Sequence, residues 1–126
     1  MNRINGARLV SVKDLEQPST VLQNILLSIG IAYKNHIIHS DLSEYNVLVG
    51  EASGDTWIID WPQAVATDHP NAQYLIKRDV FNIVRFFNRR FAVGKNLDDA
   101  LRDVLNSSTS RTSTTKNSAA LRLSTQ

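Results

Sequence analysis

The chain has 126 residues, of which 42% are hydrophobic, and a formal net charge of +2, so it holds enough apolar material for the core of one modest domain. It contains no cysteine, which excludes disulfides, zinc–thiolate sites and thiol catalysis. The most apolar stretch, VLQNILLSIGIAY, is too short to span a membrane, and no secretory signal pattern is present; we therefore expect a cytoplasmic protein with no membrane partner.

Composition divides the chain into three segments. Residues 1–17 are predicted to be an irregular or strand-like lead-in, residues 18–105 a folded unit, and residues 106–126 a Ser/Thr-rich tail too poor in large apolar groups to order itself. Three of the 14 basic residues and none of the 12 acidic ones lie in that tail. The folded unit is therefore close to neutral, which weakens the case for nucleic-acid binding from net charge alone.

Hydrophobic periodicity predicts three helices. Residues 20–34 and 71–91 place apolar side chains at helical spacing, and the sequence Pro-Ser-Thr before the first of them is a plausible entry. A short last helix is expected after Asn96, which would cap it, with Asp98 and Asp99 near its positive end.

Short strand-like runs lie between the first two helices. They are Ile37 and Ile38, residues 47–49 and residues 57–59. The last two runs are separated by a turn cluster with two glycines, so they are predicted to form a β-hairpin. We therefore expect an α+β, mainly helical fold.

A polar insert interrupts the strand-like segment IIHSDLSEYNVLV at residues 37–49. Asn46 lies just before the first hairpin strand and Asp60 just after the second, so antiparallel pairing brings both to one end of the hairpin, near Asp41. Carboxylate and amide oxygens suit Mg²⁺, which usually takes one or two protein groups and completes its shell with phosphates and water. The arrangement predicts a phosphoryl-transfer site.

His39, Asp41 and Asn46 also keep the spacing of the kinase catalytic loop, H-R-D-x-x-x-x-N. In that loop the Asp orients the attacking hydroxyl and accepts its proton, while the Asn and a later Asp hold the metal ions. Taken singly, Asp41 is compatible with a turn residue, Asn46 with a strand-entry cap and Asp60 with a solvated end residue. Their combination with the hairpin favours the catalytic interpretation.

The pieces HSDLSEYNVLV, WIIDWPQAV, DHPNA and KRDVFNIVRFFNRRF together resemble the carboxy-terminal lobe of the RIO family of atypical protein kinases, and WPQ and HPNA are most similar to its second subfamily. The resemblance covers roughly residues 18–105. It implies a protein-kinase-like C-lobe, ATP and Mg²⁺ as ligands, and a role in maturing the small ribosomal subunit, so that the pre-ribosomal particle, with its rRNA and proteins, would be a partner. Family members are thought to act more as ATPase switches than as conventional kinases.

Carried over residue by residue, the resemblance makes Asp41 the catalytic aspartate and Asn46 and Asp60 the metal ligands. Asp60 is in addition a candidate phosphate acceptor. His39 is expected to point into the core and brace the loop, and Ser43 to support it.

Two predictions on the second helix leave alternatives open. Asp79 is expected either to accept hydrogen bonds from the catalytic-loop backbone, by analogy with kinase architecture, or to form a surface salt bridge. Arg85, Arg89 and Arg90 are expected to form either a solvated face or a face that contacts phosphate or RNA.

The chain departs from the family pattern in two respects. Ser40 stands where family members usually have glycine, and at φ > 0 a serine would cost on the order of 1 kcal/mol and affect the orientation of Asp41. No glycine-rich phosphate loop and no strand lysine paired with a helix glutamate precede residue 37. We therefore expect the chain alone to be inactive, and a separate amino lobe or self-association to cover the face carrying Asp41.

Three other functions are compatible with the sequence. Small-molecule phosphotransferases of the aminoglycoside-kinase type share H-x-D-x-x-x-x-N and an I-D-W-like segment, although S-E-Y-N and W-P-Q fit them poorly. The chain is also compatible with a non-catalytic module that docks on pre-ribosomal particles, or with the remnant of a broken gene that has no function of its own.

Overall fold

The computed structural model describes residues 6–50 and 55–107. Within them, α1 (Pro18–Lys34), α2 (Ala72–Phe91) and α3 (Leu97–Ser107) are the α-helices. The predicted α+β, mainly helical fold is confirmed. α3 continues to Ser107, and the rest of the predicted tail, residues 108–126, lies outside the described residues. No helix in the described ranges is both long and apolar enough to cross a membrane.

In the described part of the chain, five short strands pair in two small antiparallel sheets. The first sheet has the order β1-β3-β4, formed by β1 (Gly6–Arg8), β3 (Val47–Gly50) and β4 (Thr56–Ile58). The second pairs β2 (Ile37–Ile38) with β5 (Val65–Ala66), a strand too short to be recognised in the sequence. A 3-10 turn, η1 (Leu9–Ser11), follows β1, so the lead-in holds both a strand and a turn.

The predicted β-hairpin is β3 and β4, with Val47 opposite Ile58 and Leu48 opposite Trp57. β4 ends one residue earlier than predicted, at Ile58. The Ile59 N–H nevertheless donates to the carbonyl of Asn46 at 2.8 Å. The chain entering β3 and the chain leaving β4 therefore stay side by side.

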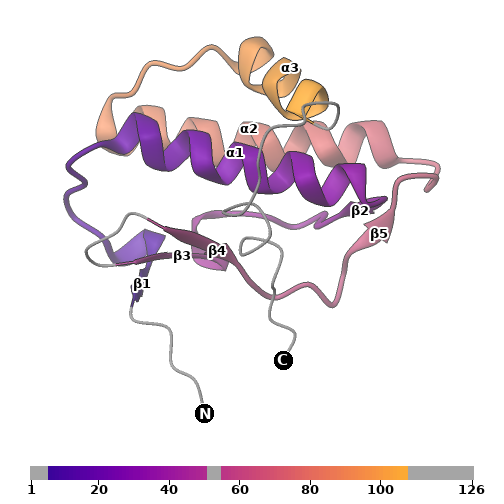
Figure 1. Ribbon diagram of the computed structural model, residues 1–126, viewed down its shortest axis with the longest axis horizontal. Helices are drawn as coiled ribbons and strands as arrows, with labels where there is room; N and C mark the ends of the chain where they lie inside the picture. The colour runs from indigo at the N-terminus through magenta and orange to yellow at the C-terminus, as the bar shows by residue number, and fades with distance from the viewer. Residues whose placement is uncertain (1–5, 51–54, 108–126) are drawn as a thin grey trace.

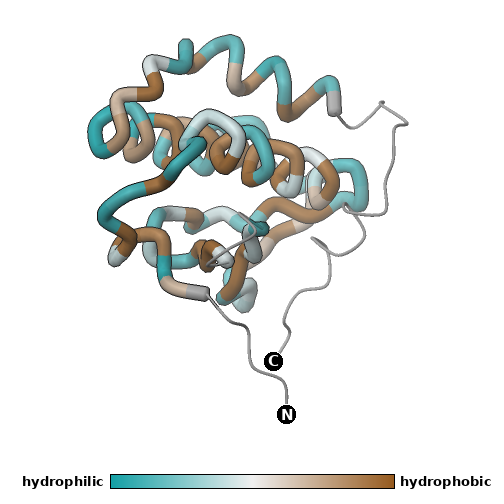
Figure 2. The backbone as a smooth tube through the Cα atoms, turned by 60° about the vertical axis from the view of Figure 1, so that its left-hand side comes forward, coloured by the Kyte–Doolittle hydropathy of each residue, from teal (hydrophilic) through white to brown (hydrophobic). Residues whose placement is uncertain are grey.

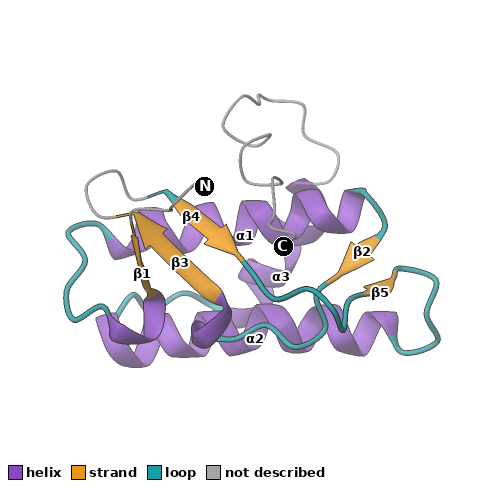
Figure 3. Cartoon of the chain, turned by 90° about the horizontal axis from the view of Figure 1, so that it is seen from below, coloured by secondary structure: helices purple, strands orange, loops and turns teal. Residues whose placement is uncertain are grey.

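The helices and sheets form layers, as Figure 1 shows. α1 and α2 run side by side in the middle, α3 lies across them on one face, and the strands lie on the other face. The same arrangement seen from below places the strands in front of α1 and α2 (Figure 3). The core fills the space between these layers.

The core is built from the apolar faces of α1 and α2, and the hydrophobic segments of the tube turn inward between helices and strands (Figure 2). α1 has Pro18 in its first turn, where the missing N–H costs no hydrogen bond. The largest side chains with under 2% exposure include Leu22, Ile25, Ile76, Ile83 and Phe87. The buried side of α2 is thus apolar except for one charged residue, Asp79.

α3 begins as predicted, because Asn96 accepts a hydrogen bond from the Asp99 N–H at 2.9 Å. Its Ala100 and Val104 are fully buried against the other helices, while Leu97 and Leu101 are partly buried. α3 therefore closes the side of the core that lies opposite the strands.

Candidate active site

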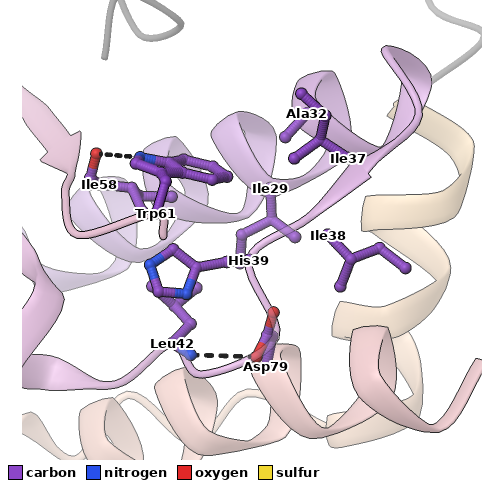
Figure 4. Close-up of a pocket in the computed structure, with 9 residues that line it drawn as sticks. All are labelled: Ile29, Ala32, Ile37, Ile38, His39, Leu42, Ile58, Trp61 and Asp79. Carbon is purple, nitrogen blue, oxygen red and sulfur yellow. Dashed lines mark hydrogen bonds between the residues drawn. The ribbon is translucent and has the colours of Figure 1, made fainter. Parts of the chain in front are cut away.

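The carboxylate of Asp79, on α2, holds the loop from His39 to Asn46. Its Oδ2 accepts the Ser40 N–H at 2.8 Å and its Oδ1 accepts the Leu42 N–H at 3.1 Å, the latter bond being drawn in Figure 4. Asp79 is 1% exposed, so the surface salt bridge considered as an alternative is absent. The two amides on either side of Asp41 are thereby fixed to α2.

Burial dominates the electrostatics of Asp79. Desolvation raises its pKa above the ordinary value of 3.8, and the hydrogen bonds from Leu42 and Ser40 and the nearby His39 and Arg78 oppose this shift. Arg78, the residue before Asp79 in α2, also donates to the Ser40 carbonyl. The carboxylate and this guanidinium therefore hold both the N–H and the C=O of Ser40.

His39 braces the loop against the segment that follows β4. It is 4% exposed, and its ring lies 4.9 Å from that of Trp61. Its Nε2 donates to the Ile59 carbonyl at 2.9 Å, so Nδ1 is the acceptor for the Gln63 amide at 3.1 Å and the Asp41 N–H at 3.3 Å. The ring thus connects the two loops that carry Asp41 and Asp60.

Ser40 is left-handed, with φ of 72°, the conformation that favours glycine. Its hydroxyl donates to the Gln63 carbonyl at 2.8 Å, and the Gln63 side-chain amide donates to the Asp60 carbonyl at 2.8 Å. A glycine at this position would lack the first of these bonds. The hydrogen bond of the serine side chain between the two loops therefore offsets the strain of its left-handed backbone.

Ser43 and Asn46 form a reciprocal cap around the 3-10 turn η2 (Glu44–Asn46). Asn46 Oδ1 accepts from the Ser43 N–H at 3.1 Å and from the Ser43 hydroxyl at 3.2 Å. The Ser43 hydroxyl oxygen in turn accepts the Tyr45 N–H at 3.2 Å. Ser43 therefore fixes the orientation of the Asn46 amide.

Asp41 and Asp60 present open carboxylates. Both residues are exposed, and neither side chain has a hydrogen bond or ion pair to any other residue in the described part of the chain. Asp60 has φ of 61°, a left-handed conformation that Asp tolerates better than most residues. Since Ile59 is bonded to Asn46, Asp60 follows directly at the same end of the hairpin, as predicted.

The donor set can hold Mg²⁺ with help from other ligands. The Asp60 carboxylate is free, and the Asn46 amide oxygen can release one lone pair if the Ser43 hydroxyl rotates away. Across residues 6–50 and 55–107, no group of three or more His, Asp or Glu side chains could hold a metal by itself. A metal bound here would therefore need phosphate and water oxygens as well.

A small apolar pocket behind the loop is a separate feature (Figure 4). It is lined by Ile29, Ala32, Ile37, Ile38, His39, Leu42, Ile58, Trp61 and Asp79. Asp41, Asn46 and Asp60 are not among these residues. The pocket therefore belongs to the packing that supports the loop, and the open carboxylates lie outside it.

Several residues that hold the site were not identified from the sequence. Gln63 joins the two loops; Asn82 donates to the Leu42 carbonyl at 3.3 Å and Arg8 to the Tyr45 carbonyl at 3.0 Å. The only signal for Gln63 was the W-P-Q segment, which served as part of a resemblance and suggested no contact. Asn82 and Arg8 lie 40 and 37 residues from their partners, and nothing in the sequence connects them.

The chain is similar in sequence to known RIO-domain proteins. A family model for the RIO domain matches residues 1–100. The chain is 43% identical over 89 residues to the RIO-type serine/threonine-protein kinase Rio2 of Methanocaldococcus jannaschii, covering 71% of the chain and 32% of that protein. It is 36% identical over 91 residues to the serine/threonine-protein kinase rio2 of Schizosaccharomyces pombe, covering 72% of the chain and 26% of that protein.

A solved structure has a similar fold. The Rio2 kinase from Chaetomium thermophilum, crystallised as an ADP/Mg²⁺-phosphoaspartate complex, matches with a TM-score of 0.67 and 27% identity, covering 96% of this chain and 42% of that one. The predicted kinase-like C-lobe and the resemblance to the second RIO subfamily are confirmed. The chain spans about a third or less of the curated relatives described above.

Substitutions at Ser40 should separate strain from hydrogen bonding. Ser40→Ala keeps the left-handed strain and loses the bond to Gln63, so we expect the free energy of unfolding to fall by about 1 kcal/mol. Ser40→Gly loses the same bond but relieves about 1 kcal/mol of strain, so it should stay close to the parent chain. Urea unfolding measures both, and equal losses would show that the backbone conformation carries no strain.

Asp79→Asn should alter the pH dependence of stability. Burial raises the pKa of Asp79 above 3.8 in the folded chain. At pH values between 3.8 and this raised pKa, Asp79 is still protonated in the folded chain but has lost its proton in the unfolded chain. Its contribution to stability is therefore largest at low pH and falls as pH rises through this window. In urea unfolding from about pH 4 upward, the stability of the parent chain relative to Asp79→Asn should decrease with pH, and an increase would mean that the pKa is lowered.

Proposed function

Since this chain belongs to the RIO domain family, we propose that it is part of a RIO-type serine/threonine kinase or ATPase that transfers a phosphoryl group from Mg-ATP. The relatives described above are serine/threonine kinases of which it spans only a part. The observation that carries the proposal is a pair of hydrogen bonds that joins the two loops with open carboxylates. The Ser40 hydroxyl donates to the Gln63 carbonyl, and the Gln63 side-chain amide donates to the Asp60 carbonyl. The RIO match favours this function over an aminoglycoside-type phosphotransferase.

Each polar residue of the site has a role in this proposal. Asp41 orients the attacking hydroxyl and takes its proton, as its exposed side chain permits. Asn46 and Asp60 would hold Mg²⁺, which would supply charge neutralisation on the phosphates. His39, Ser43 and Asp79 touch no reacting group and act as positioning residues. Such a site catalyses mainly by placing groups and charges correctly.

Asp60 is also proposed as a transient phosphate acceptor. Its free, exposed carboxylate and the phosphoaspartate in the Chaetomium thermophilum Rio2 complex support this. In the step, an Asp60 carboxylate oxygen bonds to the γ-phosphorus of ATP while the bond from that phosphorus to the bridging oxygen breaks, and ADP leaves with the electron pair. Attack of water on the phosphorus then regenerates the carboxylate and releases phosphate, so that the sum is ATP hydrolysis.

The phosphates of ATP need further ligands. The 126 residues contain no glycine-rich loop before residue 37, so we propose that an amino lobe on another segment or another chain, or self-association, completes the cleft. Tyr45, which is 57% exposed on the loop with Asp41, would lie in that contact. The proposed setting, carried from the resemblance, is maturation of the small ribosomal subunit in the cytoplasm.

The purified 126-residue chain should show negligible ATP turnover, because one side of the phosphate clamp is absent from it. Release of phosphate from ATP with Mg²⁺ measures this directly. Turnover of about 1 per second or more, as in complete kinases, and lost in Asp41→Ala, would contradict the expectation. A chain that also remains inactive with an amino lobe supplied would support the non-catalytic docking module instead.

Metal binding should distinguish the two aspartates. With an amino lobe supplied by fusion, Asp60→Asn should weaken binding of Mg-ADP at least about tenfold, since it removes a metal ligand, a change of about 1.4 kcal/mol. Asp41→Asn should leave the affinity within about threefold of the parent, because Asp41 is assigned to the attacking group. Calorimetry of both variants tests this, and equal losses would refute the assignment.

A further inference from the structure

The outward side of α2 carries a stripe of aromatic and basic side chains. The α2 stripe consists of Tyr74, Lys77, Arg78, Phe81, Arg85 and Arg89, whose three- and four-residue spacing puts them on one face of the helix. Tyr74 is 61% exposed; Lys77, Arg85 and Arg89 are exposed as well, and the other two are partly exposed. α2 lies along one edge of the molecule (Figure 3).

No ion pair among residues 6–50 and 55–107 involves a residue of the α2 stripe. The ion pairs in the described part of the chain are Lys95–Asp103 and Arg102–Asp99, both made with α3. The acidic residue within α2, Asp79, points to the catalytic loop and is 1% exposed. In the described part of the chain, Lys77, Arg85 and Arg89 therefore present cations to solvent without an ion-pair partner, while Arg78 lies near the buried carboxylate of Asp79.

Aromatic rings of the stripe lie beside three of its four cations. Lys77 Nζ lies 5.5 Å from the centre of the Phe81 ring and the Arg85 guanidinium 5.4 Å from it. The Arg78 guanidinium lies 5.7 Å from the centre of the Tyr74 ring. Contacts of this kind restrict long side chains, so a ligand that binds them loses less side-chain entropy.

The α2 stripe is long enough for a short strand of nucleic acid to lie along it. From Lys77 to Arg89 the helix rises about 18 Å, and the end of the stripe near Arg78 adjoins the loop from His39 to Asn46 through the Ser40 carbonyl.

Arg90, grouped with Arg85 and Arg89 in the sequence, is not part of the α2 stripe. Its guanidinium donates to the Val12 carbonyl at 2.8 Å and lies over Phe86 and Phe91, so it is a structural residue.

We propose that the α2 stripe binds a single-stranded RNA segment, with phosphates on Lys77, Arg85 and Arg89 and a base stacked on the exposed edge and face of Tyr74. A row of positioned cations matches the repeated anions of a nucleic-acid backbone, and an exposed aromatic beside them matches an unpaired base. An acidic peptide would satisfy the cations but leave Tyr74 without a stacking partner. The inference rests on the proposed function only for the presence of RNA in the partner, and it is independent of ATP chemistry.

The test is fluorescence anisotropy of a labelled oligouridine of about 12 nucleotides with the full chain. Arg85→Ala/Arg89→Ala should weaken binding at least about tenfold and flatten the dependence of log K on log salt by about 1.4, as expected for two lost phosphate contacts on a single strand. The matched control, Lys34→Ala/Arg102→Ala, removes the same charge from α1 and α3 and should lose less than about twofold. Tyr74→Ala should weaken binding without changing the salt slope.

Three outcomes would overturn the inference. The first is that the parent chain fails to bind the oligonucleotide. The second is that both double variants lose affinity equally, which would indicate general attraction to a basic protein. The third is that a poly-glutamate peptide of equal charge displaces the RNA at equal concentration, which would indicate a protein ligand. Circular dichroism confirms that each variant is folded. Because neither ATP nor ADP is added, failure of Mg-ADP binding in the experiment above leaves this measurement unaffected.

Discussion

The buried carboxylate of Asp79 is the interaction on which the site depends. A loop that presents Asp41 to solvent cannot be held by apolar packing of that residue, and β2, which leads into it, is only two residues long. Asp79 fixes the amides of Ser40 and Leu42 on either side of Asp41. Burying a charge is costly unless it is hydrogen-bonded, and these two N–H groups offset part of that cost while burial still raises the pKa of Asp79.

Asp79 holds the loop to α2, and a second set of contacts joins the loop to the segment after β4. His39 bonds to Ile59 and Gln63, and the Ser40 hydroxyl bonds to the Gln63 carbonyl. The two loops therefore behave as one unit. Ser40 is unusual because it combines a backbone conformation suited to glycine with a side-chain bond that glycine cannot make, so the same residue carries both the strain and its compensation.

α2 serves two sides of the molecule at once. Its inward face carries Asp79 and the apolar residues of the core, while its outward face carries the α2 stripe. Arg78 belongs to both, since its guanidinium lies over Tyr74 and also donates to the Ser40 carbonyl. A ligand on the stripe would therefore lie beside a residue that holds the loop from His39 to Asn46, which gives a direct physical route between the stripe and the candidate site.

The sequence by itself determined the helices, the hairpin and the identity of the polar residues at its end. Those features depend on local periodicity and on the spacing of His39, Asp41 and Asn46, which can be read without partners. The choice between two roles for Asp79, the φ of Ser40 and the separation of Arg90 from Arg85 and Arg89 came only from the tertiary structure. Asp79 lies 39 residues from Ser40, and Arg90 lies 78 residues from Val12. Contacts over such distances arise from the packing of whole helices, and no local pattern records them.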